Sequence, residues 1–153
     1  MKQSYLTLLL LIERLHRRFL DVIKSELDSL HMEDINNVQS LILYNIGDAS
    51  LTIGELTNRG YYLGSNVSYN IKKLVENDYL VQERSPHDKR SVKVKLSPKG
   101  TELYQKIDSL YEEHVKKLVA KGAEEEQFEN TAKTLKSLEK FWSDLINSDN
   151  FTF

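Results

Sequence analysis

The stretch YLVQERSPHDKRSVKVKL at residues 79–96 decides the fold of this chain. From Val92 to Leu96 apolar residues alternate with lysines, so that an extended chain has one apolar and one basic face, which is typical of a half-buried strand. Residues 79–84 also have strand character, and the Pro and Asp within residues 85–90 predict a turn between the two strands. The stretch therefore predicts a β-hairpin that carries basic side chains.

Two short helices are predicted before this hairpin. Residues 52–55, TIGE, have the S/T-x-x-E form of a capping box, so the first of the two starts at Thr52. Gly60 and Gly64 bracket a tight connection to the second. The second helix is predicted to stop at Asn77, because Asn adopts the left-handed backbone conformation almost as readily as Gly. Its apolar face consists of Val67, Ile71, Leu74 and Val75.

Longer helices surround the pair. Apolar residues at steps of three and four from Tyr5 to Leu30 predict the first helix of the chain. A second helix is predicted to be capped by Asp34 or Asn36 and to end at Gly47. Two more follow the hairpin: one begins at Pro98 with Ser97 as its cap and runs to Gly122, and the other carries an apolar face from Phe128 to Ile146. The predicted fold is mainly α with a small β-hairpin.

The charge of the chain is concentrated in the segment around the hairpin. The 153 residues have a formal net charge of -2, which taken alone argues against a polyanionic partner. Residues 1–58 carry -3, residues 59–100 carry +5 and residues 101–153 carry -4. A basic middle between acidic flanks indicates a local surface for a polyanion, although a solvated surface without function has the same composition.

Composition excludes several classes of protein. The chain has no cysteine, which rules out disulfides, cysteine-based zinc sites and a thiol-oxidation switch. Its longest apolar run, residues 8–12, is far shorter than the ~18 residues of a membrane span. Arg14, Arg17 and Arg18 stand where a signal peptide would have its small-residue cleavage site. We therefore expect a cytoplasmic protein without a membrane partner.

Two short helices with a tight turn, followed by a basic hairpin, predict a winged helix-turn-helix. In that arrangement the second helix of the pair, the recognition helix, enters the major groove of duplex DNA. Asn can pair with adenine, Ser can contact several bases and Lys can neutralise phosphate. Because the apolar face must be buried, the residues predicted to face solvent or DNA are Ser65, Asn66, Ser68, Tyr69, Asn70, Lys72 and Lys73.

Residues 88–100, DKRSVKVKLSPKG, resemble the wing signature of MarR-type transcriptional regulators, D-x-R-x-x-x-V-x-L-[TS]-x-x-G. The resemblance implies an obligate homodimer with the recognition helix in the major groove and the hairpin, the wing, in the minor groove. It also implies that Arg90 is the wing-tip arginine and that Asp88 orients it, in agreement with the attraction of arginine to a narrow minor groove. The predicted DNA-binding residues of the wing are His87, Asp88, Lys89 and Arg90.

Both ends of the chain carry more apolar surface than a small winged domain needs. We therefore predict a helical dimerisation region from residues 1–33 and 101–153, and a DNA-binding domain at residues 34–100. A monomeric helical cap is the alternative. The predicted interface residues are Leu6, Leu9, Leu10, Phe141, Trp142 and Ile146, with Phe151 and Phe153 near the end of the chain.

The resemblance further implies a small aromatic or anionic effector that binds between the dimer helices and the winged domain, as in a ligand-responsive repressor. No other cofactor and no metal is expected. The candidate pocket residues, each of which also fits a role in a core or an interface, are His16, Phe19, His31, Tyr44 and Tyr111.

An enzyme and a protein-binding module are the two alternatives to DNA binding. An enzyme is not expected, because the four histidines are scattered and no H-E-x-x-H, G-x-S-x-G or phosphate-binding loop occurs. The same histidines lack the close spacing of a metal site. The remaining alternative is a dimeric winged-helix module that acts through a protein partner rather than through DNA.

Overall fold

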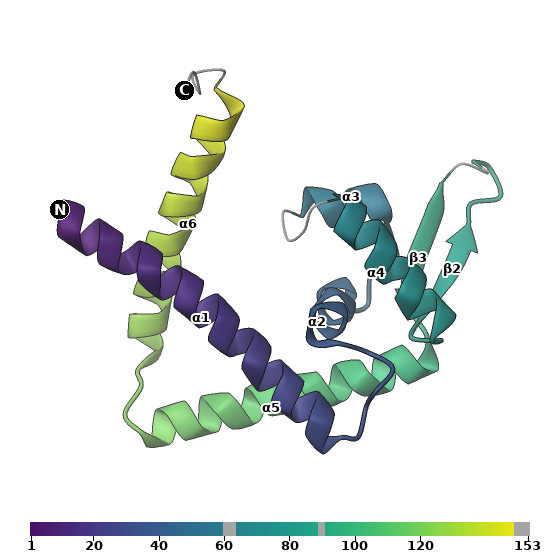
Figure 1. Ribbon diagram of the computed structural model, residues 1–153, viewed down its shortest axis with the longest axis horizontal. Helices are drawn as coiled ribbons and strands as arrows, with labels where there is room; N and C mark the ends of the chain where they lie inside the picture. Colours follow the sequence, from purple (N-terminus) through teal and green to yellow (C-terminus); the bar gives the residue numbers. More distant parts are fainter. Residues whose placement is uncertain (60–63, 89–90, 149–153) are drawn as a thin grey trace. The chain divides into compact units, whose positions relative to one another are not determined.

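A computed structural model of the chain describes residues 1–59, 64–88 and 91–148 (Figure 1). The chain divides into two compact units, Met1–Asp108 and Ser109–Phe153. None of the helices in the described ranges combines the length and the apolar character that a membrane crossing requires. The elements are α1 (Lys2–Ser29), α2 (Asn37–Ile46), β1 (Leu51–Thr52), α3 (Ile53–Asn58), α4 (Gly64–Glu76), β2 (Leu80–Arg84), β3 (Val92–Leu96), α5 (Pro98–Ala120) and α6 (Glu125–Asn147).

The predicted hairpin forms and belongs to a sheet of three antiparallel strands in the order β1-β3-β2. Leu80 is paired with Leu96 and Arg84 with Val92, so the whole of β2 lies along β3. The third strand, β1, was not predicted. It is only two residues long and pairs Leu51 with Val94 on the other edge of β3, so it shows no alternation from which it could be recognised.

Side-chain caps start α2 and α3 where the sequence predicts them. Asn36, not Asp34, caps α2: its Oδ1 accepts a hydrogen bond from the Gln39 N–H at 2.8 Å, and Gln39 Oε1 accepts from the Asn36 N–H at 3.1 Å. Thr52 and Glu55 form the predicted capping box of α3. These caps satisfy N–H groups that have no partner within the helix.

The recognition helix, α4, ends as predicted after Glu76, but the residue responsible is not Asn77. Asp78 has the positive φ, 63°, and the Asp78 and Tyr79 N–H groups bond to the carbonyls of Val75 and Leu74. This is the hydrogen-bond pattern of a Schellman motif. The Asn77 side chain instead donates to the Asp34 carbonyl at 2.8 Å, so its role is a long-range contact.

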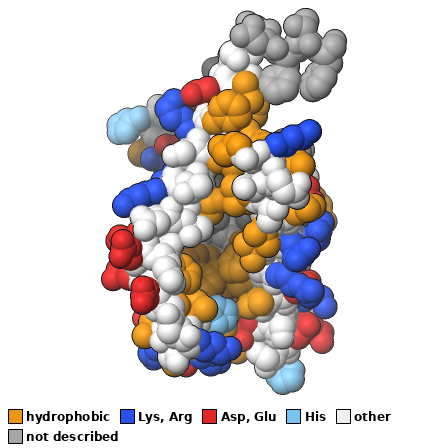
Figure 2. Space-filling model, turned by 90° about the vertical axis from the view of Figure 1, so that its left-hand side faces the viewer, with side chains coloured by type: hydrophobic (Ala, Val, Ile, Leu, Met, Phe, Trp, Pro, Cys, Tyr) orange, Lys and Arg blue, Asp and Glu red, His pale blue; other side chains and the backbone are white. Residues whose placement is uncertain are grey.

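The core of the first unit joins both long and short helices to the sheet. Ile23 and Leu27 of α1, Leu103 and Ile107 of α5, and Tyr79 and Val94 of the sheet region are all almost completely buried. In the second unit, by contrast, no residue of α6 is buried. Hydrophobic side chains gather on the face shown in the space-filling view (Figure 2).

Candidate nucleic-acid interface

The apolar stripe of α4 determines which side chains the helix presents to solvent. Val67, Ile71 and Leu74 are each only 1% exposed, as predicted for the buried face, and Val75 beside them is half-buried. A buried stripe at this spacing holds the helix by one side, so the residues on the opposite side face outward. Those that do so among the predicted DNA-binding residues are Asn66, Ser68, Tyr69 and Lys72.

One predicted DNA-binding residue of α4 faces the core instead. Asn70 is 9% exposed; its Oδ1 accepts a hydrogen bond from Gln39 Nε2 at 3.2 Å, and its Nδ2 donates to the Asn66 carbonyl at 2.8 Å. The prediction that the Asn70 side chain faces outward is therefore wrong, because Asn70 lies one turn from Val67 and Leu74, on the side of the helix that packs inward.

The lysines of α4 differ in how far they are already neutralised. Lys73 Nζ lies 3.1 Å from Glu76 Oε2 and 5.9 Å from the centre of the Tyr69 ring. A hydrogen bond to Glu76 and the charge of that carboxylate raise the pKa of Lys73, so it stays protonated. Lys72 is more exposed and lies 3.9 Å from Glu76. The side chain of Ser65 lies outside the described residues.

The wing carries further cations on its strands. Lys93 and Lys95 are exposed on β3, and Arg84 is exposed at the end of β2. Lys95 forms an ion pair with Glu83 of the neighbouring strand, and the hydrogen bond from Lys95 is the main cause that lowers the pKa of Glu83. These cations belong to the predicted basic segment but not to the predicted site; the alternation of apolar and basic residues along β3 is the sequence signal that places them there.

At the wing tip the structure places two of the four predicted residues. His87 is exposed, and its backbone N–H donates to Ser85 Oγ at 3.4 Å. The Asp88 carbonyl accepts from the Ser91 N–H at 3.1 Å. Asp88, Ser91 and Val92 face the start of α3 across an open hollow of about 470 Å³. Lys89 and Arg90 lie outside the described residues.

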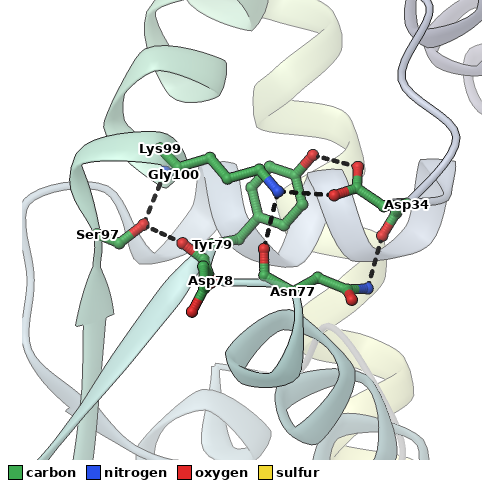
Figure 3. Close-up of polar contacts among 7 residues, drawn as sticks. All are labelled: Asp34, Asn77, Asp78, Tyr79, Ser97, Lys99 and Gly100. Carbon is green, nitrogen blue, oxygen red and sulfur yellow. Dashed lines mark hydrogen bonds and ion pairs between the residues drawn. The ribbon is translucent and has the colours of Figure 1, made fainter.

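At the C-terminal end of the recognition helix, a polar cluster joins the α1–α2, α4–β2 and β3–α5 connections (Figure 3). The Tyr79 hydroxyl donates to Asp34 Oδ1 at 2.6 Å, and Lys99 Nζ donates to Asp34 Oδ2 at 2.6 Å and to the Asn77 carbonyl at 2.9 Å. Burial raises the pKa of Tyr79 far above its usual value, and the hydrogen bond to Asp34 raises it further. Tyr79 therefore remains a donor, and the cluster fixes the end of α4 against the start of α5.

The candidate effector residues are spread over both units. In the first unit His16 and Phe19 are exposed on α1, and His31 has φ 54° in the turn that ends this helix. Tyr44 is half-buried; its hydroxyl donates to Asp108 at 2.7 Å and its ring stacks on Tyr104 at 4.8 Å. In the second unit Tyr111 lies 6.4 Å from the His114 ring. A hollow of about 420 Å³ in this unit was not predicted; it is lined by Val115, Leu118, Val119, Ala123, Glu124, Glu125 and Phe128.

The candidate interface residues lie on the two end helices and are largely exposed. Leu6 and Leu10 of α1 are 41% and 62% exposed, and Phe141 and Ile146 of α6 are 53% and 74% exposed. Leu9 and Trp142 are half-buried. Apolar surface of this extent is what the predicted interface requires. Phe151 and Phe153 lie outside the described residues.

Comparisons with known proteins agree with this architecture. The model of the MarR family matches residues 33–91. The exopolysaccharide II synthesis transcriptional activator ExpG of Rhizobium meliloti is 37% identical over 139 residues, which are 91% of this chain and 72% of that protein. The HTH-type transcriptional regulator YkoM of Bacillus subtilis is 41% identical over 66 residues, 43% of this chain and 42% of YkoM.

Solved structures extend the likeness to nearly the whole chain. Staphylococcus aureus MarR, in complex with salicylate and kanamycin, has a TM-score of 0.74 at 25% identity over 94% of this chain and 93% of its own. Streptococcus pneumoniae FabT, in complex with DNA, has a TM-score of 0.75 at 22% identity over 92% of this chain and 99% of its own. The predicted fold and the prediction of a regulator rather than an enzyme are confirmed, and this chain belongs to the MarR family of winged helix-turn-helix transcriptional regulators.

Proposed function

We propose that the protein is a homodimer that binds a pseudo-palindromic site in duplex DNA, with α4 in the major groove and the wing in the minor groove. The observation that carries this proposal is the burial of Val67, Ile71 and Leu74, each 1% exposed, because it turns Asn66, Ser68, Tyr69 and Lys72 outward. An outward set of amide, hydroxyl, aromatic and ammonium groups can read base edges and hold phosphates at the same time.

The basic wing supports the same surface. Lys93 and Arg84 are exposed on adjacent strands, and residues 59–100 carry a net charge of +5 in a chain whose total is -2. A local excess of cations attracts DNA although the whole chain is slightly acidic. The structures of FabT and of S. aureus MepR are complexes with DNA, and both have the fold of this chain.

Dimerisation is proposed from the exposed apolar side chains of the end helices. A twofold axis would place two recognition helices ~34 Å apart, which is one turn of DNA. The two halves of the pseudo-palindromic site would then each bind one recognition helix. The same apolar surface left in solvent on a monomer would favour aggregation.

For the response to a ligand, we propose a small aromatic or anionic effector. Salicylate, which is both aromatic and anionic, is present in the S. aureus MarR structure. An effector would act by stabilising one spacing of the two recognition helices over another, and its difference in affinity for the two states limits the effect. The pocket residues proposed for it stay His16, Phe19, His31, Tyr44 and Tyr111.

Repression is proposed for a site that overlaps a promoter, since a bound dimer there excludes polymerase. The relative ExpG is named an activator, so the opposite sign of regulation has to be tested as well. A reporter gene placed behind the selected DNA site, with and without the protein, measures the sign directly: lower expression supports repression, and higher expression contradicts it.

The experiment that tests the DNA-binding proposal is selection of duplex sites from a random pool by the purified full chain. A recovered pseudo-palindrome whose half-sites are about one helical turn apart supports it. If the recovered pool has no common sequence and binds no better than bulk DNA, the proposal is wrong. The alternative, a module for a protein partner, predicts in addition that any binding to the partner survives Arg90→Ala and depends little on salt.

A further inference from the structure

We propose that Asn70 and Gln39 are positioning residues for base recognition: their buried amide bridge fixes the rotation of the recognition helix and so determines where Asn66 meets a base. This inference rests on the proposed DNA-binding function. It assigns to Asn70 an indirect role in place of the DNA contact that the sequence predicted.

The bridge connects the first turn of α2 to the first turns of α4. Gln39 Nε2 donates to Asn70 Oδ1 at 3.2 Å, and Asn70 Nδ2 donates to the Asn66 carbonyl at 2.8 Å. Gln39 Oε1 is held in turn by the Asn36 N–H at 3.1 Å. Both amides are nearly buried, with Gln39 7% and Asn70 9% exposed. A continuous chain of hydrogen bonds therefore runs from the α2 cap to Asn66.

A polar bridge in this place restrains the helix in a way that its apolar neighbours do not. Val67, Ile71 and Leu74 pack by non-directional contacts, which tolerate a small rotation of α4 about its axis. The amides do not, because rotation would leave a donor and an acceptor buried without partners. A fully satisfied buried network favours one arrangement over its near neighbours.

The consequence should be seen in specificity and not in general affinity for DNA. A hydrogen bond to a base edge weakens steeply when donor and acceptor are misaligned. We expect Lys72 to contact a phosphate as a mobile charge on a long side chain, so a small rotation of α4 should cost that contact little. Loss of the bridge should therefore weaken binding to the selected site and leave binding to an unrelated duplex unchanged.

The test compares the full-length variants Asn70→Leu, Gln39→Met and the double variant. Asn70→Leu and Gln39→Met each remove one side of the bridge. The double variant replaces both amides by apolar groups of similar size, which avoids an unpaired buried amide if either single variant folds poorly. Ser40→Ala is the matched control, because Ser40 is a buried polar residue of α2 that bonds to its own helix at Asn37.

The measurement is the dissociation constant for the selected duplex and for a scrambled duplex of equal length, by fluorescence anisotropy over a salt series. The specificity ratio is the dissociation constant for the scrambled duplex divided by that for the selected duplex. We expect this ratio to fall about tenfold in each of the three variants and to stay unchanged in Ser40→Ala. We expect the constant for the scrambled duplex and its salt dependence to stay as in the wild type.

Gln39→Met separates positioning from direct contact. Gln39 lies on α2 and is buried, so it reaches DNA only through Asn70. If Asn70→Leu lowers the ratio and Gln39→Met does not, Asn70 contacts a base itself and the inference is overturned. It is also overturned if the double variant keeps the wild-type ratio, or if specific and scrambled affinities fall together. A wild-type protein that does not discriminate between the duplexes contradicts the proposed function itself.

Discussion

The Nζ atom of Lys99 lies 2.6 Å from Oδ2 of Asp34, although the two residues are 65 positions apart in the sequence. The same ammonium group lies 4.2 Å from the centre of the Tyr79 ring, whose hydroxyl donates to the other oxygen of Asp34. The segment before α2, the start of β2 and the start of α5 are thus tied at one point (Figure 3). This point lies directly behind the end of the recognition helix.

The Asp34–Lys99 pair should make stability depend on pH in the acid range. Partial burial opposes ionisation of Asp34, but hydrogen bonds from Lys99 and Tyr79 and the Lys99 charge together hold its pKa below the ordinary 3.8. Because the pKa is lower in the folded state, the stabilisation is present above the unfolded pKa and is lost as pH falls through the folded pKa. We expect Asp34→Asn to lower the free energy of unfolding by about 1 kcal/mol near neutral pH and to have no such effect once Asp34 of the wild type is protonated.

Urea denaturation at several pH values checks this prediction. Asp28→Asn is the control, because the Asp28–Lys24 pair is 3.6 Å long and both side chains are about two-thirds exposed. If the difference in the free energy of unfolding between Asp34→Asn and the wild type stays constant from neutral to acid pH, the assigned role of the Asp34 carboxylate is contradicted.

Gly100 should not tolerate a side chain. A Cβ atom at this position in the first turn of α5 would lie 2.1 Å from the Tyr79 carbonyl oxygen, which also accepts the Ser97 N–H. We expect Gly100→Ala to lower the free energy of unfolding by about 3 kcal/mol, because a backbone atom must move. Gly54→Ala is the control: its nearest neighbour, Thr52 Oγ1, lies at 3.8 Å, and alanine should stabilise α3 by about 0.5 kcal/mol. Equal denaturation midpoints for the two variants would show that the close approach is absent.

Asn66 and Lys72 should affect DNA binding in different ways. We expect Asn66→Ala to reduce the preference for the selected site by roughly 1–3 kcal/mol, since an amide can pair with a base edge. We expect Lys72→Ala to weaken binding to all duplexes alike and to reduce the salt slope, log K against log salt, by about 0.9. Titrations of specific and scrambled duplexes at several salt concentrations measure both; a uniform effect of Asn66→Ala would show that Asn66 contacts the backbone of DNA only.

The apolar end helices should carry the dimer. Ile146 and Leu10 are 74% and 62% exposed, so a charge at either position is tolerated in a monomer and is costly in an apolar interface. We expect Ile146→Glu and Leu10→Glu to shift the mass measured by light scattering from two chains towards one. Val81→Ser changes an exposed apolar residue of the wing and should leave the mass unchanged. A wild-type mass of one chain at micromolar concentration would contradict the dimer.

The parts of the fold that were predicted depend on neighbours in the sequence. The Thr52–Glu55 capping box needs only four consecutive residues, and the Ser97 cap of α5 is confirmed by the Gly100 N–H at 3.0 Å from Ser97 Oγ. The buried face of α4 follows from the helical repeat of its apolar residues. Each of these features is local, so its physical cause can be seen in the sequence.

The parts that were missed depend on partners far along the chain. Asn70 was assigned to DNA because a polar residue is expected at the surface, and only the approach of Gln39 from α2 makes its burial favourable. Asn77 was assigned to the helix end for its backbone preference, whereas its amide is used to bond Asp34. Lys89, Arg90 and the side chain of Ser65 lie outside the described residues, so their assignments stay predictions.

The sequence by itself determined the type and order of the helices and of the hairpin, and the basic character of the segment at residues 59–100. Periodicity, capping residues and charge are properties of neighbouring residues, and they act before the chain is folded. Only the tertiary structure decided which polar side chains of α4 face outward and which are buried against α2. That choice depends on the directional hydrogen bond between Gln39 and Asn70, 31 positions apart, which forms only when the packed core has brought the two residues together.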